Sequence, residues 1–150
     1  MATAASAPTL NGAIQTMAMN GADSAKNSHR DVVETTRTPF TSLCNRDKTL
    51  RVPIAHGEGR YYLDKNTIEQ LEAHEQIVFR YVDEQNRPTE DANPNGSINN
   101  IAGICNKQGN VMGLMPHPER ASIPTLSPDG QAYGRIIFDS MLDTLNKMRN

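Results

Sequence analysis

Apolar residues in the middle and second half of the chain fall into short runs with the composition of β-strands. The clearest run, residues 76–82, is rich in the β-branched and aromatic residues that strands favour. Two further runs, 98–105 and 110–115, flank a short polar stretch ending in glycine, with the length and composition of a hairpin loop. Shorter strands are predicted at 32–36 and 51–55. The pattern therefore predicts a sheet that includes at least one hairpin.

Two segments carry the signals of helices. Asn66 and Glu69 have the spacing of a capping box, which predicts a helix that begins there and ends near His74. The last part of the chain, 131–148, repeats apolar residues at helical spacing, which is typical of a face packed on a core. These residues are Tyr133, Ile136, Ile137, Met141, Leu142, Leu145 and Met148. Helices between and after strands predict an α/β layer fold.

The first 30 residues differ in composition from the rest. They are rich in Ala, Ser, Thr, Asn and Gly, and their apolar positions follow neither a helical nor a strand period. We interpret residues 1–30 as a poorly ordered leader and expect the folded domain to occupy residues 31–150.

Charge and cysteine content exclude several classes of protein. The chain has 15 basic and 17 acidic residues, mixed along the sequence, so nothing predicts a nucleic-acid partner. No run approaches the roughly 20 apolar residues that a membrane span requires, and the first residues lack the basic and apolar regions of a secretory signal, so none is expected. Two cysteines without a C-x-x-C spacing indicate a reduced setting. We therefore expect a cytoplasmic protein that does not bind membranes.

The strongest candidate for chemistry is His117 with Glu119. His117 follows the predicted strand 110–115, and open α/β sheets build their sites at the carboxyl ends of strands. An imidazole can take a proton from a nucleophile and return it to a leaving group, and a nearby carboxylate can fix its tautomer. A surface turn whose His and Glu face solvent is the alternative, because a single short motif is weakly specific.

A second candidate is the run His56, Gly57, Glu58 and Gly59, which also follows a predicted strand. Glycines on both sides of Glu58 allow another group to approach the backbone closely. A tight turn with a solvated carboxylate explains the same run.

Two other patterns are weaker than they look. His56 and Glu58 have the H-x-E spacing of zinc deaminases, but the P-C-x-x-C partner is absent, so we expect no metal site. Cys105 lies in a partial nucleophile elbow, Gly103-Ile104-Cys105-Asn106, with Lys107 where the last glycine belongs. We therefore interpret Cys105 as a buried strand residue. Cys44 has no elbow around it.

Four segments taken together resemble one family. They are the Thr-Pro-Phe-Thr run at 38–41, residues 53–61 around His56, the Asn-Pro-Asn-Gly-Ser run at 93–97, and residues 115–120 around His117. The resemblance is to the class I glutamine amidotransferase subunit of phosphoribosylformylglycinamidine synthase, an enzyme of purine synthesis. It covers about residues 31 to 145.

This resemblance implies a flavodoxin-like α/β amidotransferase domain with a mixed sheet. It implies glutaminase chemistry, in which a cysteine thiolate attacks glutamine and ammonia leaves. His117 would then be the general base, Glu119 would orient it, and His56, Gly57, Glu58 and Gly59 would serve the glutamine pocket or an interface. The implied partner is an ATP- and magnesium-dependent synthetase subunit, joined in some bacteria by a small third subunit. This chain itself would need no cofactor.

One departure from the family changes the functional expectation. The family's N-terminal strands and its G-x-C-x-G elbow have no counterpart before residue 31. We therefore expect a C-terminal portion of the domain, without its nucleophile and inactive by itself. Two alternatives stay open: a non-catalytic module that binds the synthetase subunit, and an independent hydrolase that uses Cys105.

Overall fold

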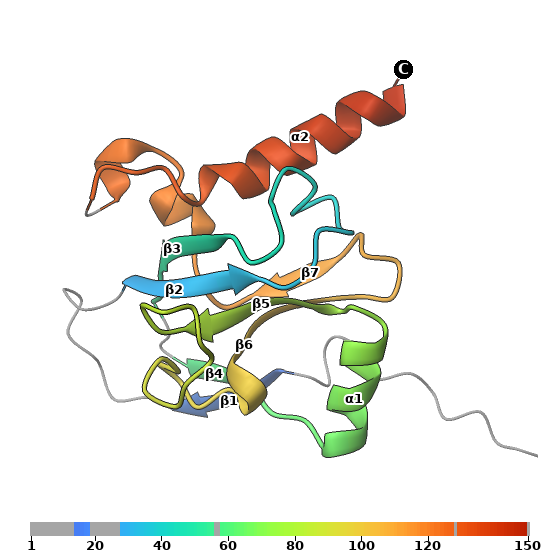
Figure 1. Ribbon diagram of the computed structural model, residues 1–150, viewed down its shortest axis with the longest axis vertical. Helices are drawn as coiled ribbons and strands as arrows, with labels where there is room; N and C mark the ends of the chain where they lie inside the picture. The colour runs from blue at the N-terminus through green and yellow to red at the C-terminus, as the bar shows by residue number, and fades with distance from the viewer. Residues whose placement is uncertain (1–13, 19–27, 56–57, 128, 150) are drawn as a thin grey trace, which may run out of the picture.

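The structure is a computed structural model that describes residues 14–18, 28–55, 58–127 and 129–149. Its centre is a five-stranded sheet with the strand order β3-β2-β5-β6-β7 (Figure 1). A second, two-stranded sheet pairs β1 with β4. The bounds are β1 Ile14–Ala18, β2 Ser28–Val33, β3 Thr49–Pro53, β4 Glu58–Tyr61, β5 Ile77–Val82, β6 Ile101–Cys105 and β7 Met112–Leu114.

Every strand pairing among the described residues is antiparallel. This corrects the expected mixed sheet, although the α/β class is confirmed. Parallel neighbours need a long crossover, usually through a helix, whereas β6 and β7 are joined by a short loop. That hairpin is confirmed, with Cys105 opposite Met112 and Gly103 opposite Leu114.

The predicted strands are found, with shifted ends. The strand expected at 32–36 is β2, which begins at Ser28 and ends at Val33, because Asp31 and Val32 pair with both β3 and β5. The strand expected at 98–105 is shorter. Ile98–Asn100 forms a 3-10 turn before β6, with Asn99 and Asn100 at positive φ.

Residues 1–30, expected to be a poorly ordered leader, include one strand and part of another. The backbone of Ile14–Ala18 forms β1, which pairs with β4, and the first half of β2 also lies before residue 31. The remaining residues of this stretch, 1–13 and 19–27, lie outside the described residues. The division of the chain at residue 30 stays a prediction.

Helix α1, Lys65–Ala73, lies against one face of the sheet and buries Leu71. Its N-cap is Asp64, which corrects the capping box predicted at Asn66. The Asp64 carboxylate accepts hydrogen bonds from the Thr67 backbone N–H at 3.0 Å and the Thr67 hydroxyl at 2.6 Å. It satisfies one of the amides that the first helical turn leaves without a partner.

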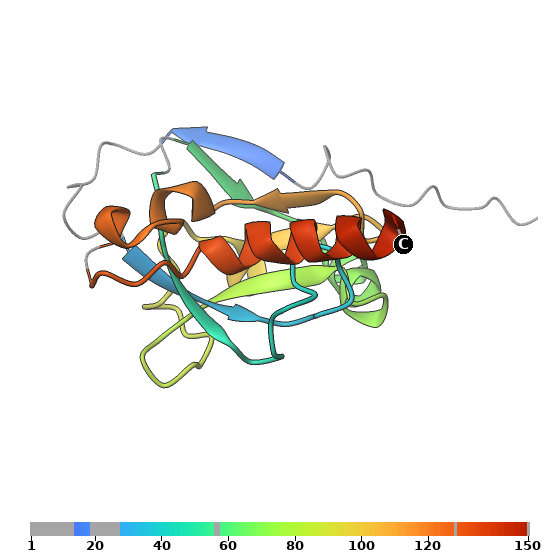
Figure 2. The ribbon, with the colours of Figure 1, turned by 90° about the horizontal axis from the view of Figure 1, so that it is seen from above.

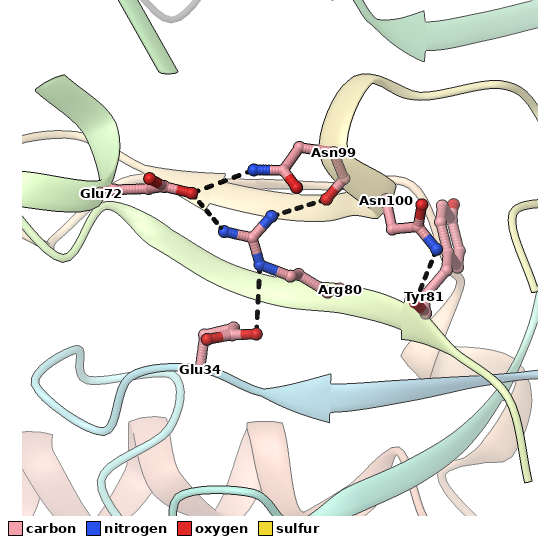
Figure 3. Close-up of polar contacts among 6 residues, drawn as sticks. All are labelled: Glu34, Glu72, Arg80, Tyr81, Asn99 and Asn100. Carbon is pink, nitrogen blue, oxygen red and sulfur yellow. Dashed lines mark hydrogen bonds and ion pairs between the residues drawn. The ribbon is translucent and has the colours of Figure 1, made fainter. Parts of the chain in front are cut away.

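A buried arginine connects α1 to the sheet (Figure 3). Arg80 of β5 is nearly buried, and its guanidinium contacts Glu72 of α1 at 2.9 Å and Glu34 at 3.1 Å. It also donates to the carbonyl oxygen of Asn99 at 2.6 Å. Because both carboxylates and a carbonyl surround it, the buried charge is compensated. The network fixes α1 relative to β5 and the turn before β6.

Helix α2, Arg135–Arg149, packs across the opposite face of the sheet (Figure 2). It inserts Ile137 into a core cluster with residues of the central strands, and Ser140 is fully buried. A smaller cluster under α1 contains Tyr61, Leu71, Ile77, Ile101 and Ile104. The two helices therefore close two apolar layers, one on each face. No helix among the described residues is long and apolar enough to cross a membrane.

Candidate functional site

His117 is held at the point where β7 and β3 end. The Met115 backbone N–H donates to the Ala102 carbonyl, which continues the β6–β7 ladder beyond β7. Two residues later, the His117 N–H donates to the carbonyl of Pro53, the last residue of β3, at 2.8 Å. His117 therefore follows a strand end, as expected. Its backbone is held by its own hydrogen bond to β3 and, through Met115, by the hydrogen bond to β6.

A 3-10 turn, Pro118–Ala121, places Glu119 beside His117. Pro118 is at the first position of this turn, where its fixed φ favours a helical start. The Arg120 N–H donates to the His117 carbonyl at 3.1 Å, which closes the turn. The Ser122 hydroxyl donates to the Glu119 carbonyl at 2.8 Å and stiffens it further.

The two side chains meet as the sequence predicted. Nδ1 of His117 lies 2.8 Å from Oε1 of Glu119. With the carboxylate ionised, Nδ1–H is the donor, so Nε2 is the ring nitrogen left to exchange a proton. The imidazole is 37% exposed and the carboxylate 57%, which leaves the pair open to a substrate or to another chain.

Electrostatics keep Glu119 ionised. Burial raises the pKa of its carboxyl, but the Glu119 backbone N–H, the hydrogen bond and charge of His117, and the charge of Arg120 outweigh burial. The pKa of Glu119 therefore lies below its ordinary value. A carboxylate that stays charged near neutral pH can stabilise an imidazolium, which is the role of the third member of a triad.

The second candidate run is described only in part. His56 and Gly57 lie outside the described residues, and of Glu58 only the backbone, in β4, is placed. Gly59 is buried at φ +125°, and a Cβ there would meet Cε of Met115 at 3.1 Å. Glycine is therefore required at 59, because any other side chain would be strained and would press on the residue two positions before His117.

Residues 93–97 hold β4 in this place, a role that sequence reasoning did not assign. The Asn95 side-chain amide donates to the Gly59 carbonyl at 3.1 Å. The Ser97 hydroxyl accepts the Tyr61 backbone N–H at 3.1 Å. The Tyr61 hydroxyl in turn donates to the carbonyl of Gly113 in β7 at 2.8 Å. Three of the four motif segments thus converge around the end of β7.

The fourth segment lies elsewhere. The hydroxyls of Thr38 and Thr41 form a buried hydrogen bond of 2.8 Å within a turn. Arg37, just before it, donates to the carbonyls of Glu75 and Lys107 at 3.0 and 3.2 Å. This segment closes the loop end of the β6–β7 hairpin, opposite the end that leads to His117, so its role is structural.

Neither cysteine is placed to act with His117. Cys105 is buried at the loop end of the hairpin, whereas His117 lies beyond the other end, past Ala102. Ala102 to Cys105 alone spans about 10 Å of strand. Burial raises the pKa of the Cys105 thiol, even though Arg37 lowers it from 3.4 Å away. The independent hydrolase that would use Cys105 is therefore contradicted.

Cys44 is also a core residue. It is buried in the cluster beneath α2, and burial raises the pKa of its thiol more than Lys48 lowers it. A neutral, buried thiol is a poor nucleophile, since the thiolate is the reactive form. Within the placed part of the chain, no group of three or more His, Cys, Asp or Glu side chains could hold a metal ion.

The sequence of the chain matches a known class of protein. The model of the CobB/CobQ-like glutamine amidotransferase domain matches residues 12–135. The chain belongs to this family. The match also includes β1, at positions that the sequence had suggested were a leader.

Two relatives within the family carry the same name. The chain is 52% identical over 115 residues to phosphoribosylformylglycinamidine synthase subunit PurQ of Methanosarcina acetivorans. It is 63% identical over 89 residues to the subunit of the same name from Thermomicrobium roseum. The match covers 77% of this chain and 48% of the M. acetivorans subunit in the first case, and 59% and 38% in the second.

A solved structure agrees with this assignment. The chain is similar to part of the structure of PurLQS from Thermotoga maritima, with a TM-score of 0.61 and 33% sequence identity. The match covers 91% of this chain and 50% of the solved chain. The chain thus spans about half the length of the relatives it matches.

Proposed function

We propose that this chain contributes the proton-transfer pair of a glutamine-hydrolysing site in phosphoribosylformylglycinamidine synthase. The observation that carries the proposal is the 2.8 Å contact between His117 Nδ1 and Glu119 Oε1, on a turn fixed at the ends of β7 and β3. Nε2 of His117 takes the proton of a cysteine nucleophile and returns it to the departing ammonia. Glu119 holds the tautomer and stabilises the imidazolium between these steps.

The nucleophile in this proposal is not Cys44 or Cys105. Both thiols are buried, burial raises their pKa values, and Cys105 lies at the wrong end of its hairpin. We therefore expect the chain by itself to release little or no ammonia from glutamine. A triad without its nucleophile loses most of its covalent chemistry.

The glutamine pocket would extend from His117 toward β4. A Cβ at Gly59 would come within 3.1 Å of Cε of Met115, and Asn95 holds the Gly59 carbonyl, so the backbone of β4 approaches the strand end from one side. Within this proposal, residues 56–59 line the glutamine pocket or an interface beside it.

The proposed partner is the synthetase subunit, which would bind ATP and magnesium and use the ammonia. Support comes from the relatives, which are named as subunits of phosphoribosylformylglycinamidine synthase, and from the likeness to part of the PurLQS structure. A small third subunit belongs to the same proposal. The chain would need no cofactor of its own and would act in the cytoplasm, where its two free cysteines stay reduced.

A second candidate function is a non-catalytic module that binds the synthetase. The burial of both thiols favours this candidate. The described residues then contain no accessible cysteine that could complete a triad with His117 and Glu119, and binding is the function that remains for them.

Purified chain, with and without a synthetase subunit, tests both candidates. Complex formation is measured by light scattering during gel filtration, and ammonia release from glutamine is measured on the same samples. The proposal expects a complex, with no ammonia from the chain alone. Ammonia release by the isolated chain that is lost in both Cys105→Ser and His117→Ala would overturn the assignment of the nucleophile. Failure to bind the synthetase at micromolar concentrations contradicts both candidates.

A further inference from the structure

The turn at residues 93–97 supplies side chains where β4 has no neighbouring strand. Among the described strands, β4 pairs only with β1. On its other edge, the Gly59 carbonyl accepts the side-chain amide of Asn95 at 3.1 Å. The Tyr61 N–H donates to the Ser97 hydroxyl at the same distance. Because residues two apart on a strand direct their backbone groups to the same edge, these two side chains take the place of a partner strand.

Asn95 is held in one orientation from within the turn and from the main sheet. Its side-chain oxygen accepts the Ser97 backbone N–H at 3.1 Å, and a side-chain hydrogen bond joins it to Tyr81 of β5. The residue is only 7% exposed. Since the Ser97 N–H is a donor, the amide oxygen must face it, and the amide nitrogen is left to face the Gly59 carbonyl. Asn95 therefore connects β4 to a fixed point.

The carbonyl that Asn95 holds belongs to a residue beside the segment that leads to His117. A Cβ at Gly59 would lie 3.1 Å from Cε of Met115. The Met115 backbone is bonded to β6, and two residues later the His117 backbone is bonded to β3. The position of the β4 backbone relative to His117 therefore depends in part on the bond from Asn95.

We propose that Asn95 is a positioning residue for glutamine binding, because its amide fixes the wall that β4 forms beside His117. The inference rests on the proposed function, in which residues 56–59 line the glutamine pocket, and it adds a determinant of substrate affinity from a distant turn. Asn95 acts through Gly59 and not on the reacting atoms. Loss of its bond should therefore weaken glutamine equally in the ground state and the transition state, which raises KM and leaves kcat unchanged.

Asn95→Asp removes the donor and keeps the shape of the side chain. The carboxylate still accepts the Ser97 N–H, but it cannot donate to the Gly59 carbonyl. Ammonia release is measured with the chain, the synthetase subunit and a polypeptide that carries the nucleophilic cysteine of a relative. We expect the KM for glutamine to rise at least about fivefold, with kcat within about twofold of the wild-type value.

Asn93→Asp is the matched control, because it makes the same change in the same turn. The Asn93 side-chain amide donates to the Ser97 carbonyl at 2.7 Å, within the turn. Urea unfolding should show similar losses of stability in the two variants, whereas only Asn95→Asp should raise KM. Asn95→Ala is a second variant that removes the donor without adding a charge, and it should raise KM as Asn95→Asp does.

Two kinetic outcomes would overturn the inference and leave the proposed function intact. Equal KM values in Asn95→Asp and Asn93→Asp would mean that the turn acts through stability alone. A KM that rises in Asn95→Asp but not in Asn95→Ala would assign the effect to the added charge. No ammonia from the wild-type mixture is a different result, which contradicts the proposed function and, with it, this inference.

Discussion

The hydroxyl of Tyr61 in β4 donates a hydrogen bond of 2.8 Å to the carbonyl of Gly113 in β7, four residues before His117. This bond joins the two strands that approach the candidate site from different sheets. Burial raises the pKa of Tyr61 far above its ordinary value, so the hydroxyl remains a donor throughout the pH range in which the chain can be studied.

Tyr61→Phe should therefore destabilise the chain by about 1 kcal/mol, because the buried ring is kept while the Gly113 carbonyl loses a donor. Urea unfolding at neutral pH measures the change in free energy. Tyr62→Phe is the matched control, since the Tyr62 side chain is largely exposed, and it should change stability by less than about 0.5 kcal/mol. Equal effects of the two substitutions would mean that the bond to Gly113 contributes nothing.

The buried carboxyl of Asp31 should make the free energy of unfolding fall as pH rises. It is fully buried in β2, and its carboxyl oxygens have no hydrogen-bond partner among the described residues. Burial raises the pKa of Asp31 well above its ordinary value. The folded state therefore binds the proton more tightly than the unfolded state, and stability is highest below the unfolded pKa. It falls as pH rises from that value to the folded pKa.

Asp31→Asn removes this titration and should stabilise the chain at pH 7 by roughly 1–3 kcal/mol, with the advantage shrinking toward pH 4. Denaturant unfolding at a series of pH values measures it. Asp91→Asn, at an exposed position, is the control and should show no such trend. A wild-type chain as stable at pH 7 as the Asp31→Asn chain would show that the buried carboxyl is compensated.

Gly134 sets the contact between the start of α2 and the turn that carries Glu119. Its N–H donates to the Ala121 carbonyl at 2.9 Å, and a Cβ at 134 would overlap the Pro118 carbonyl oxygen. Gly134→Ala should force this backbone apart and destabilise the chain by about 1–3 kcal/mol. Thermal unfolding checks it, with Gly130→Asn as the control. Position 130 has open space, and Asn tolerates its φ of +71°. Tolerance of Ala at 134 would contradict the close packing.

The ionisation of Glu119 should depend on His117. In His117→Ala the carboxyl loses a hydrogen bond and a nearby charge, so its pKa should rise toward the ordinary value. The depressed folded pKa gives ionised Glu119 a stabilising effect that is complete above its unfolded pKa and is lost as pH falls through the folded pKa. With a carboxylate this exposed, the effect is well below 1 kcal/mol. Carbon-13 NMR titration measures the pKa directly, and an unchanged value in His117→Ala would rule out the contact.

The His117–Glu119 contact could be predicted from the sequence because it is local. Two residues apart and flanked by prolines, these side chains need only one turn to meet, and the strand before them has a clear apolar pattern. The hairpin of β6 and β7 was predictable for the same reason.

The contacts between distant segments could not be predicted. Hydrogen bonds join Tyr61 to Gly113, Asn95 to Gly59, and Ser97 to Tyr61 across long stretches of chain. No periodicity in the sequence encodes such pairings. β1 was missed because its sequence, Ile-Gln-Thr-Met-Ala, alternates weakly and depends on pairing with β4. The cap at Asp64 was missed because Asn66 and Glu69 offered a competing pattern two residues later.

The most direct test of the central claim is ammonia release from glutamine by this chain together with the synthetase subunit and a polypeptide that carries the nucleophilic cysteine of a relative. The His117→Ala chain should lower the rate by at least about a hundredfold, whereas Cys105→Ser should leave it unchanged. An unchanged rate in His117→Ala, a lost rate in Cys105→Ser, or no ammonia from the complete mixture would contradict the assignment of His117 as the general base.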